Sequence, residues 1–199
     1  MNLCALLLAA GVGRRFGADK LSAPLADGTP LAVAAARNLL AAGCEVNAVV
    51  RAAETGVAPA LARLGIALVP CADAHLGMGH SLACGVRASA NADGWLVALA
   101  DMPFVQPASI TAVADALAAG CDLAAPSFGG RRGHPVGFAA GFREALLGLH
   151  GDQGARGLLR AQTARIVDIP VADAGVLRDI DRPADLRWCA GGDTESRHP

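Results

Sequence analysis

The sequence predicts an α/β fold in three layers, α/β/α, with a sheet covered by helices on both faces. Short runs rich in leucine and valine alternate with alanine-rich stretches of helical length, a pattern typical of strands buried on both sides. The 199 residues suffice for one domain with a well-buried core. We place this single domain at residues 1–189 and expect 190–199, which lack apolar periodicity, to form a disordered tail.

The expected elements follow one another in a regular order. The strand-like runs are Leu3–Ala9, Glu45–Val50, Ile66–Pro70, Gly94–Leu99 and Asp122–Pro126. The helical stretches are Pro30–Ala42, Val57–Leu64, Gly79–Ser89, Pro107–Ala119, Gly141–Leu149 and Ala155–Ala161. The turn Asp27-Gly28 precedes the first helix, with Thr29 expected as its N-cap and Pro30 as its first residue. Gly43, Gly65 and Gly120 are each expected to end a helix.

Composition excludes several classes of partner. A net charge of −1 and an aromatic content of 4% provide neither the general attraction nor the stacking platforms that nucleic-acid binding requires. Charged residues, glycine or proline interrupt every apolar run before the roughly 18 residues that a membrane span needs. Six cysteines are widely spaced with no C-x-x-C pair, which favours buried thiols in a reducing cytoplasm over disulfides or a zinc site.

A glycine-rich loop follows the first strand. Its residues are Leu8-Ala9-Ala10-Gly11-Val12-Gly13-Arg14-Arg15-Phe16-Gly17-Ala18-Asp19-Lys20. Glycines let backbone N–H groups approach phosphate oxygens, and the three cations supply charge-assisted hydrogen bonds. The spacing fits neither a G-x-G-x-x-G dinucleotide loop nor a Gly-Lys-Ser/Thr loop. We therefore predict a polyphosphate-binding loop of another kind, the alternative being a surface turn with solvated cations.

Carboxylates at two places suggest a magnesium site. Asp101 directly follows the apolar run Trp95–Ala100, at the end of the strand where α/β sheets bind ligands. Mg²⁺ takes one or two carboxylates and leaves its other positions to phosphate and water. Asp179 and Asp181 lie on one face if their segment is extended, so one of them could complete the site. The alternatives are a turn or helix start at each place.

Three further loops carry polar groups suited to ligands. Gly79 and Ser81 open an alanine-rich helix, where backbone groups and a hydroxyl could meet a nucleobase or sugar. The segment Gly129–Phe138 contains Arg132 and His134 and leads into an expected strand, and we interpret it as a ligand loop. For His134 we favour a binding role over catalysis, because phosphoryl transfer depends mainly on positioning and charge. The third loop holds Asp152 and Arg156 at another helix start. Helix capping and ordinary surface positions are the competing explanations.

The order of these motifs resembles the nucleotidyltransferases of the molybdenum cofactor, from Leu6 to about Leu186. Beside the first loop, the matching segments are Gly79-x-Ser81-Leu82-x-x-Gly85, Ala100-Asp101-Met102-Pro103, Arg132-Gly133-His134-Pro135-Val136, Gly151-Asp152-x-Gly154-Ala155-Arg156 and Asp179-Ile180-Asp181-x-Pro183-x-Asp185-Leu186. The chain is most similar to the cytidylyltransferases, whose first loop has Leu-Ala-Ala-Gly, whereas guanylyltransferases have Leu-Ala-Gly-Gly. Ala10 is the discriminating residue. Phe16-Gly17 and Asp101-Met102-Pro103 depart from the family's frequent Met-Gly and Asp-Gln-Pro.

This resemblance implies a Rossmann-like nucleotidyltransferase fold with a mostly parallel mixed sheet. It implies transfer of CMP from CTP to the terminal phosphate of molybdenum-molybdopterin, with release of pyrophosphate. Residues implied for CTP are Leu8, Ala9, Ala10, Gly11, Gly13, Arg14, Lys20, Gly79 and Ser81, with Arg15, Lys20 and Asp101 catalytic. Mg²⁺ would be held by Asp101 and Asp181, and the pterin substrate by Arg132, His134, Asp152 and Arg156. A molybdoenzyme or its maturation chaperone would be the protein partner.

Three alternatives stay open at this stage. A guanylyltransferase or sugar-phosphate nucleotidyltransferase would use the same chemistry on another base or acceptor. An NAD(P)-dependent oxidoreductase would use the glycine loop for a dinucleotide, against the spacing noted above. A non-catalytic carrier of the molybdenum cofactor would bind the cofactor and release no pyrophosphate.

Overall fold

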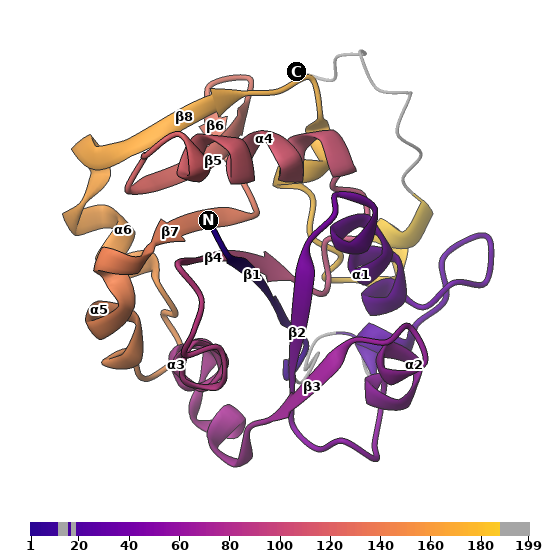
Figure 1. Ribbon diagram of the computed structural model, residues 1–199. Coiled ribbons are helices and arrows are strands. Elements are labelled where there is room, and N and C mark those ends of the chain that lie inside the picture. The colour runs from indigo at the N-terminus through magenta and orange to yellow at the C-terminus, as the bar shows by residue number, and fades with distance from the viewer. Residues whose placement is uncertain (12–15, 17–18, 188–199) are drawn as a thin grey trace.

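This computed structural model describes residues 1–11, 16 and 19–187. Within these residues the chain forms a mixed sheet of eight strands, of which β1 (Leu3–Leu8) is the first along the chain (Figure 1). The other strands are β2 (Glu45–Val50), β3 (Ala67–Pro70), β4 (Gly94–Leu99), β5 (Leu123–Phe128), β6 (Arg131–Arg132), β7 (Val136–Ala139) and β8 (Ile166–Pro170). Neighbours follow the order β3-β2-β1-β4-β7-β5-β6, and β8 pairs with β5. The β4–β7, β7–β5 and β5–β6 pairs are antiparallel, and the remaining pairs are parallel.

The parallel half of the sheet creates a place for a ligand. Leu8 at the end of β1 lies opposite Val49 of β2 and Leu99 of β4, so three carboxyl ends meet at one edge. The chain adds β2 and β3 on one side of β1 and β4 on the other. Such a reversal of strand order leaves a crevice beyond the strand ends, which is where open α/β sheets bind their ligands.

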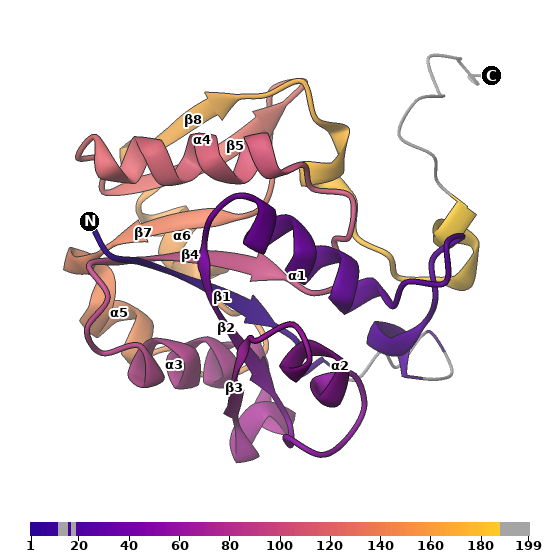
Figure 2. The ribbon, with the colours of Figure 1, turned by 45° about the vertical axis from the view of Figure 1, so that its right-hand side comes forward.

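Helices cover both faces of the sheet, as Figures 1 and 2 show. They are α1 (Leu31–Ala41), α2 (Ala58–Ala62), α3 (Met78–Ala88), α4 (Pro107–Ala118), α5 (Arg143–Leu147) and α6 (Arg156–Ala161). Successive side chains of β1 alternate between two cores: Ala5 and Leu7 pack with α1, α2 and α4, whereas Leu6 packs with α3 and α5. This alternation is the period of two expected of a strand buried on both faces. The predicted three-layer α/β fold is confirmed.

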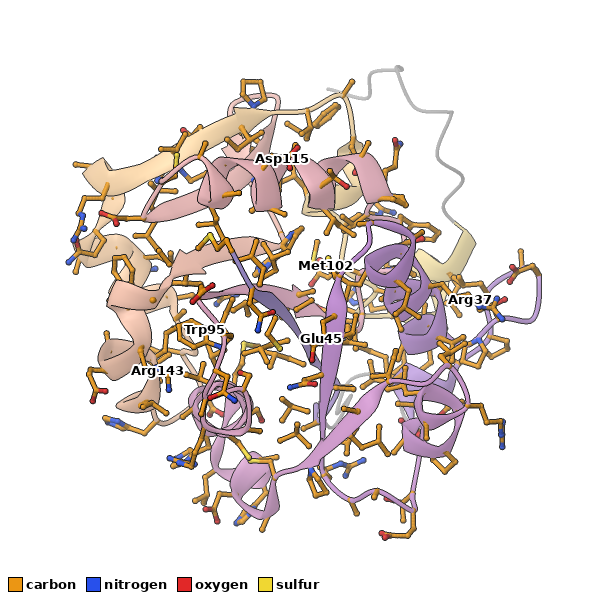
Figure 3. All side chains as sticks on the ribbon, viewed as in Figure 1. Arg37, Glu45, Trp95, Met102, Asp115 and Arg143 are labelled. Carbon is orange, nitrogen blue, oxygen red and sulfur yellow. The ribbon has the colours of Figure 1, made fainter. Side chains whose placement is uncertain are left out.

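Side chains fill the space between the layers (Figure 3). At the amino-terminal edge of β4, the Arg143 guanidinium of α5 lies over the Trp95 ring, 5.3 Å from its centroid. The indole Nε1 of Trp95 donates to Ser89 Oγ at 2.8 Å, so this buried ring leaves no polar atom unpaired. None of the helices in the described part of the chain is long and apolar enough to cross a membrane.

Two local expectations need correction. Thr29 is not the N-cap of α1: the helix begins at Leu31 with Pro30 as its N-cap, and no side chain caps it. The Thr29 backbone N–H and Oγ1 instead donate to the two carboxylate oxygens of Asp27, at 2.9 and 3.0 Å. Asp27 lies only two residues away in the same turn, so the Thr29 side chain bonds to this carboxylate and not to the first N–H groups of the helix. Strands β6 and β8 were not predicted from the sequence.

Candidate functional site

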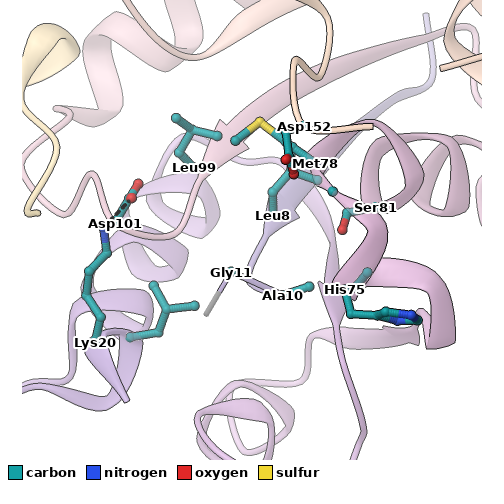
Figure 4. Close-up of a pocket in the computed structure, with 13 residues that line it drawn as sticks. Leu8, Ala10, Gly11, Lys20, His75, Met78, Ser81, Leu99, Asp101 and Asp152 are labelled. Atoms are coloured by element: carbon teal, nitrogen blue, oxygen red, sulfur yellow. Dashed lines mark hydrogen bonds and ion pairs between the residues drawn. The ribbon is translucent and has the colours of Figure 1, made fainter. Parts of the chain in front are cut away.

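A cleft of about 340 Å³ lies beyond the carboxyl ends of β1 and β4 (Figure 4). Leu8 and Leu99, the last residues of these two strands, form its floor together with Ala10 and Gly11. Lys20 and Asp101 lie at one end of the cleft, and Ser81 and His75 at the other. The complete lining is Leu8, Ala10, Gly11, Lys20, Leu21, Ala74, His75, Gly77, Met78, Ser81, Leu99, Asp101 and Asp152.

One lysine joins two carboxylates at the charged end. Lys20 Nζ lies 2.8 Å from Asp101 Oδ2 and 3.0 Å from Asp181 Oδ1. Lys20 is 8% exposed, and burial alone lowers the pKa of its ammonium. The negative charges of Asp101 and then Asp181 outweigh that effect, so the pKa of Lys20 is raised above its ordinary value. The ammonium therefore stays positively charged at this end of the cleft.

Backbone hydrogen bonds bring Asp181 to this position from far along the chain. Ile180 is fully buried and its N–H donates to the Asp101 carbonyl at 2.9 Å. The Asp185 carboxylate accepts from the N–H groups of Asp181 and Arg182 at 3.0 and 2.8 Å, and these bonds hold the pKa of Asp185 below its ordinary value. Asp179, the other sequence candidate, is exposed. Of the two acidic residues, the structure brings Asp181 to Lys20.

Close backbone packing shapes the opposite end. Gly77, with a φ of 127°, precedes α3, and the Gly79 N–H donates to the Gly151 carbonyl at 2.8 Å. A Cβ on Gly79 would lie 2.6 Å from the His150 carbonyl oxygen, and one on Gly77 would lie 2.4 Å from the Gly151 carbonyl oxygen. Only glycine permits this approach. It places Asp152 beside α3 and thus on the cleft (Figure 4).

Many of the predicted nucleotide-site residues converge on this cleft. Leu8, Ala10, Gly11, Lys20, Ser81 and Asp101 line it, and so does Asp152, which the family resemblance assigned to the other substrate. Ala9 is buried, with its N–H donating to the Val49 carbonyl at 2.8 Å, and Gly79 faces the loop at His150. Gly13, Arg14 and Arg15 lie outside the described residues. His75, Gly77, Met78 and Leu99 line the cleft without having been predicted.

Arg132 and His134 line a second hollow, of about 230 Å³, between β5, β7 and α6. Arg132 forms a two-pronged ion pair with Asp168. His134 Nδ1 is buried and has no hydrogen-bond partner among the described residues. Burial lowers the pKa of His134, and the charge of Arg156 adds to this, despite opposing effects from the Val97 backbone, Asp101 and Asp179. His134 is therefore a neutral ring at pH 7. Arg156 itself is exposed at the start of α6.

The donor set at the charged end suits a hard divalent cation. Asp101 and Asp181 offer carboxylate oxygens to one positive group, and hard cations prefer such oxygens. The described residues contain no group of three or more acidic, histidine or cysteine side chains arranged to hold a metal. Two carboxylates with the remaining positions left to phosphate and water is the arrangement that Mg²⁺ commonly takes beside a nucleotide.

Two curated relatives match almost the whole chain. The purine catabolism protein PucB of Bacillus subtilis (strain 168) is 33% identical over 195 residues, covering 92% of this chain and 93% of the relative. The nicotine blue oxidoreductase of Paenarthrobacter nicotinovorans is 33% identical over 188 residues, covering 88% and 90%. Sequences that share this much over nearly their full length share a fold, whereas their names differ in activity.

A solved structure and a family profile agree with these matches. Rv0371c of Mycobacterium tuberculosis H37Rv, solved in complex with manganese, has a TM-score of 0.74 and 26% identity, and the match covers 94% of this chain and 97% of that one. The profile of the MobA-like NTP transferase domain matches residues 5–166, which include most of β1, the cleft floor and Asp101. The chain belongs to the MobA-like NTP transferase family.

Proposed function

We propose that this protein is a cytidylyltransferase that transfers CMP from CTP to the terminal phosphate of molybdenum-molybdopterin. The observation that carries the proposal is the cleft itself, which has the ion-paired triad of Lys20, Asp101 and Asp181 at one end and the Ser81 hydroxyl, with His75 and Asp152, toward the other. A nucleoside triphosphate would place its anionic phosphates at the Lys20 end and its base toward Ser81. Membership of an NTP transferase family supports the assignment of a nucleotide to this cleft.

The reaction exchanges one phosphoric anhydride for another. An oxygen of the acceptor phosphate attacks the α-phosphorus of CTP, the bond from that phosphorus to the β-phosphate oxygen breaks, and pyrophosphate leaves with the bonding electrons. Lys20 neutralises charge on the departing phosphates. Asp101 and Asp181 would hold Mg²⁺, whose contribution when bound is to neutralise charge on the phosphate oxygens. The backbone at Ala10 and Gly11 positions the nucleotide over the ends of β1 and β4.

The preference for cytosine rests on Ala10, which is 4% exposed and lines the cleft. Cytidylyltransferases of the molybdenum cofactor have alanine here, and the related guanylyltransferases have glycine. The resemblance at this cleft-lining position is what favours cytosine over guanine. The hollow at Arg132 and His134 is the candidate place for the pterin acceptor, and a molybdoenzyme would receive the product.

A second candidate comes from the relative named nicotine blue oxidoreductase, which is as similar in sequence as PucB. An oxidoreductase would need a redox cofactor in place of a triphosphate. The glycine loop of this chain lacks the G-x-G-x-x-G spacing of dinucleotide-binding sites. The buried ammonium between two carboxylates also has no part in hydride transfer, so we rank this activity second.

Pyrophosphate release tests both candidates. Each of the four nucleoside triphosphates is supplied with Mg²⁺, with and without molybdenum cofactor, and separate reactions contain a sugar phosphate as acceptor. Release that requires both CTP and the cofactor is the expected result. Release with GTP, or with a sugar phosphate in place of the cofactor, identifies another transferase of the family. Binding of NAD(P) at micromolar concentration without any pyrophosphate release would favour the oxidoreductase.

A further inference from the structure

Lys20 occupies the position between the two carboxylates that would bind the cation. Its Nζ contacts Asp101 Oδ2 at 2.8 Å and Asp181 Oδ1 at 3.0 Å. A divalent cation bridging Asp101 and Asp181 would compete with Nζ for these carboxylates. The ammonium and the cation would also repel each other strongly at such short range. Lys20 therefore already neutralises part of the negative charge of the two carboxylates that would hold the metal.

Hydrogen bonds fix the backbone that carries the two carboxylates. Ile180 is fully buried and is bonded to the Asp101 carbonyl, and Asp185 holds the backbone at Asp181. Lys20 lies in a short 3₁₀ turn, Lys20–Ser22, and reaches the carboxylates through a flexible four-carbon stem. The Lys20 head group can therefore move while the backbone that carries the two carboxylates stays in place.

We propose that Lys20 acts as a placeholder for the divalent cation, so that the cation enters only together with a nucleoside triphosphate. Among the described side chains of this cluster, two carboxylates and one ammonium leave a single negative charge, which attracts a free divalent cation weakly. A triphosphate in the adjoining cleft offers the ammonium new anionic partners. Lys20 then moves to the phosphates and the vacated carboxylates take the cation. The inference rests on the proposed nucleotidyl transfer and adds an order of binding to it.

In the free enzyme, Lys20 bridges the two carboxylates and so sets their spacing for the incoming metal. Lys20 is in this sense a positioning residue before it contacts any phosphate.

Manganese binding to the nucleotide-free protein tests the proposal, because free aquo Mn²⁺ gives a paramagnetic resonance signal that bound ion does not. Wild-type protein should bind Mn²⁺ weakly, in the millimolar range. Lys20→Met should bind a single Mn²⁺ at least about tenfold more tightly, since one opposing positive charge is gone. Lys20→Gln serves as a second neutral variant, and circular dichroism checks that each variant is folded. Lys20→Arg, which keeps the charge, should bind as weakly as wild type.

Two controls locate the effect. Arg63→Met removes one positive charge from an exposed residue at the C-cap of α2 that does not line the cleft, and should leave Mn²⁺ binding unchanged. Adding Asp101→Asn to Lys20→Met should abolish the gain, because the ion then loses one of its two carboxylates.

The proposal is overturned if Lys20→Met and Lys20→Gln bind Mn²⁺ no more tightly than wild type. It is also overturned, whatever the variants do, if wild-type protein binds one Mn²⁺ at micromolar concentration without nucleotide. These measurements contain neither CTP nor an acceptor, so they stay separate from the pyrophosphate assay. If the base or the acceptor is wrongly assigned, the pyrophosphate assay with CTP and the cofactor gives no release, and the Mn²⁺ binding measurement is unaffected.

Discussion

At the scale of single residues, Asp101 combines two roles that are usually divided between two residues. Its side chain contacts Lys20, while its backbone carbonyl accepts from the Ile180 N–H and so fixes the segment that carries Asp181. The position directly after a buried strand made Asp101 predictable from the sequence. The sequence could not predict that Asp181 and not Asp179 reaches the cleft, because an extended segment places both side chains on one face. The discriminating contact is the Asp185 carboxylate, which accepts from the Asp181 N–H and holds that residue where it meets Lys20.

Asp101→Asn should lower the rate of pyrophosphate release about a hundredfold, equivalent to about 3 kcal/mol, by analogy with the loss of one preorganised charge contact. The amide keeps the size of the side chain and removes its charge, so the fold should persist. Asp115→Asn, on the exposed surface of α4, is the matched control and should retain full activity. Near-wild-type turnover of Asp101→Asn at saturating Mg²⁺ would contradict the assignment.

His134 gives the protein a pH dependence of stability whose sign follows from its burial. Its pKa in the folded protein lies below the ordinary 6.5, so at mildly acidic pH the unfolded chain binds a proton that the folded chain does not. Stability contributed by the neutral ring is complete above about pH 7 and is lost as the pH falls from 6.5 through the folded pKa. His134→Gln, which has no such proton, should lose less stability than wild type over this range.

Urea unfolding at pH 7.5 and at pH 5.5 measures this difference. Other groups titrate in the same range, and comparing wild type with the variant at both pH values cancels their contributions. Equal changes in the free energy of unfolding for the two proteins would mean that His134 is protonated as readily in the folded state as in the unfolded state.

At the scale of elements, α3 and the loop before α6 form one wall of the cleft through backbone contact. Gly79 bonds to Gly151, and Gly77 leaves no space for a side chain against the same loop. The start of this helix was predicted within one residue from its alanine-rich pattern. The positions of His75 and Met78 on the cleft could not be predicted from the sequence, because they depend on contact with the loop at Gly151, more than 70 residues away along the chain.

Gly79→Ala should disturb this wall. The added methyl group would lie 2.6 Å from the His150 carbonyl oxygen, so the helix and the loop must separate. We expect a loss of about 1–3 kcal/mol in the free energy of unfolding, with a raised KM for the nucleotide because Ser81 moves with the helix. Gly141→Ala is the control, since nothing lies within 4 Å of its added Cβ, and both properties should stay unchanged there. A Gly79→Ala protein with wild-type stability and KM would show that the packing is looser than described.

At the scale of the whole molecule, the chain after residue 166 returns along the sheet and completes a site begun by the first strand. Strand β8 pairs with β5, the Val176 carbonyl accepts from the His134 N–H at 2.9 Å, and Ile180 bonds to Asp101. The parallel half of the fold was predictable because its strands are apolar and its helices end at glycines. Strand β8 escaped prediction although Ile166, Val167 and Ile169 are β-branched, because Asp168 and Pro170 interrupt the apolar pattern of this edge strand, whose side chains are mostly exposed.

Asp173 anchors this returning segment. Its carboxylate is 3% exposed and accepts from Gln106 N, Ser109 Oγ and Gly175 N at 2.8 to 2.9 Å. Asp173→Ala would leave these donors without their partner, and we expect a loss of about 2–3 kcal/mol in the free energy of unfolding. Urea denaturation measures it. Asp168 lies on the same segment and is half-exposed, so Asp168→Ala should cost less than about 1 kcal/mol. Equal losses for the two variants would contradict a special role for Asp173.

The glycine contacts between α3 and the loop at Gly151 have a consequence for how substrate preference could evolve in this fold. That wall is made of main chain against main chain, so its position cannot drift with ordinary side-chain replacement. Met78 is 44% exposed and, with His75, stands on the rim of the cleft without supporting the core. New nucleotide preferences can therefore be explored at these rim positions, by mutation or by design, while the wall that carries them stays the same.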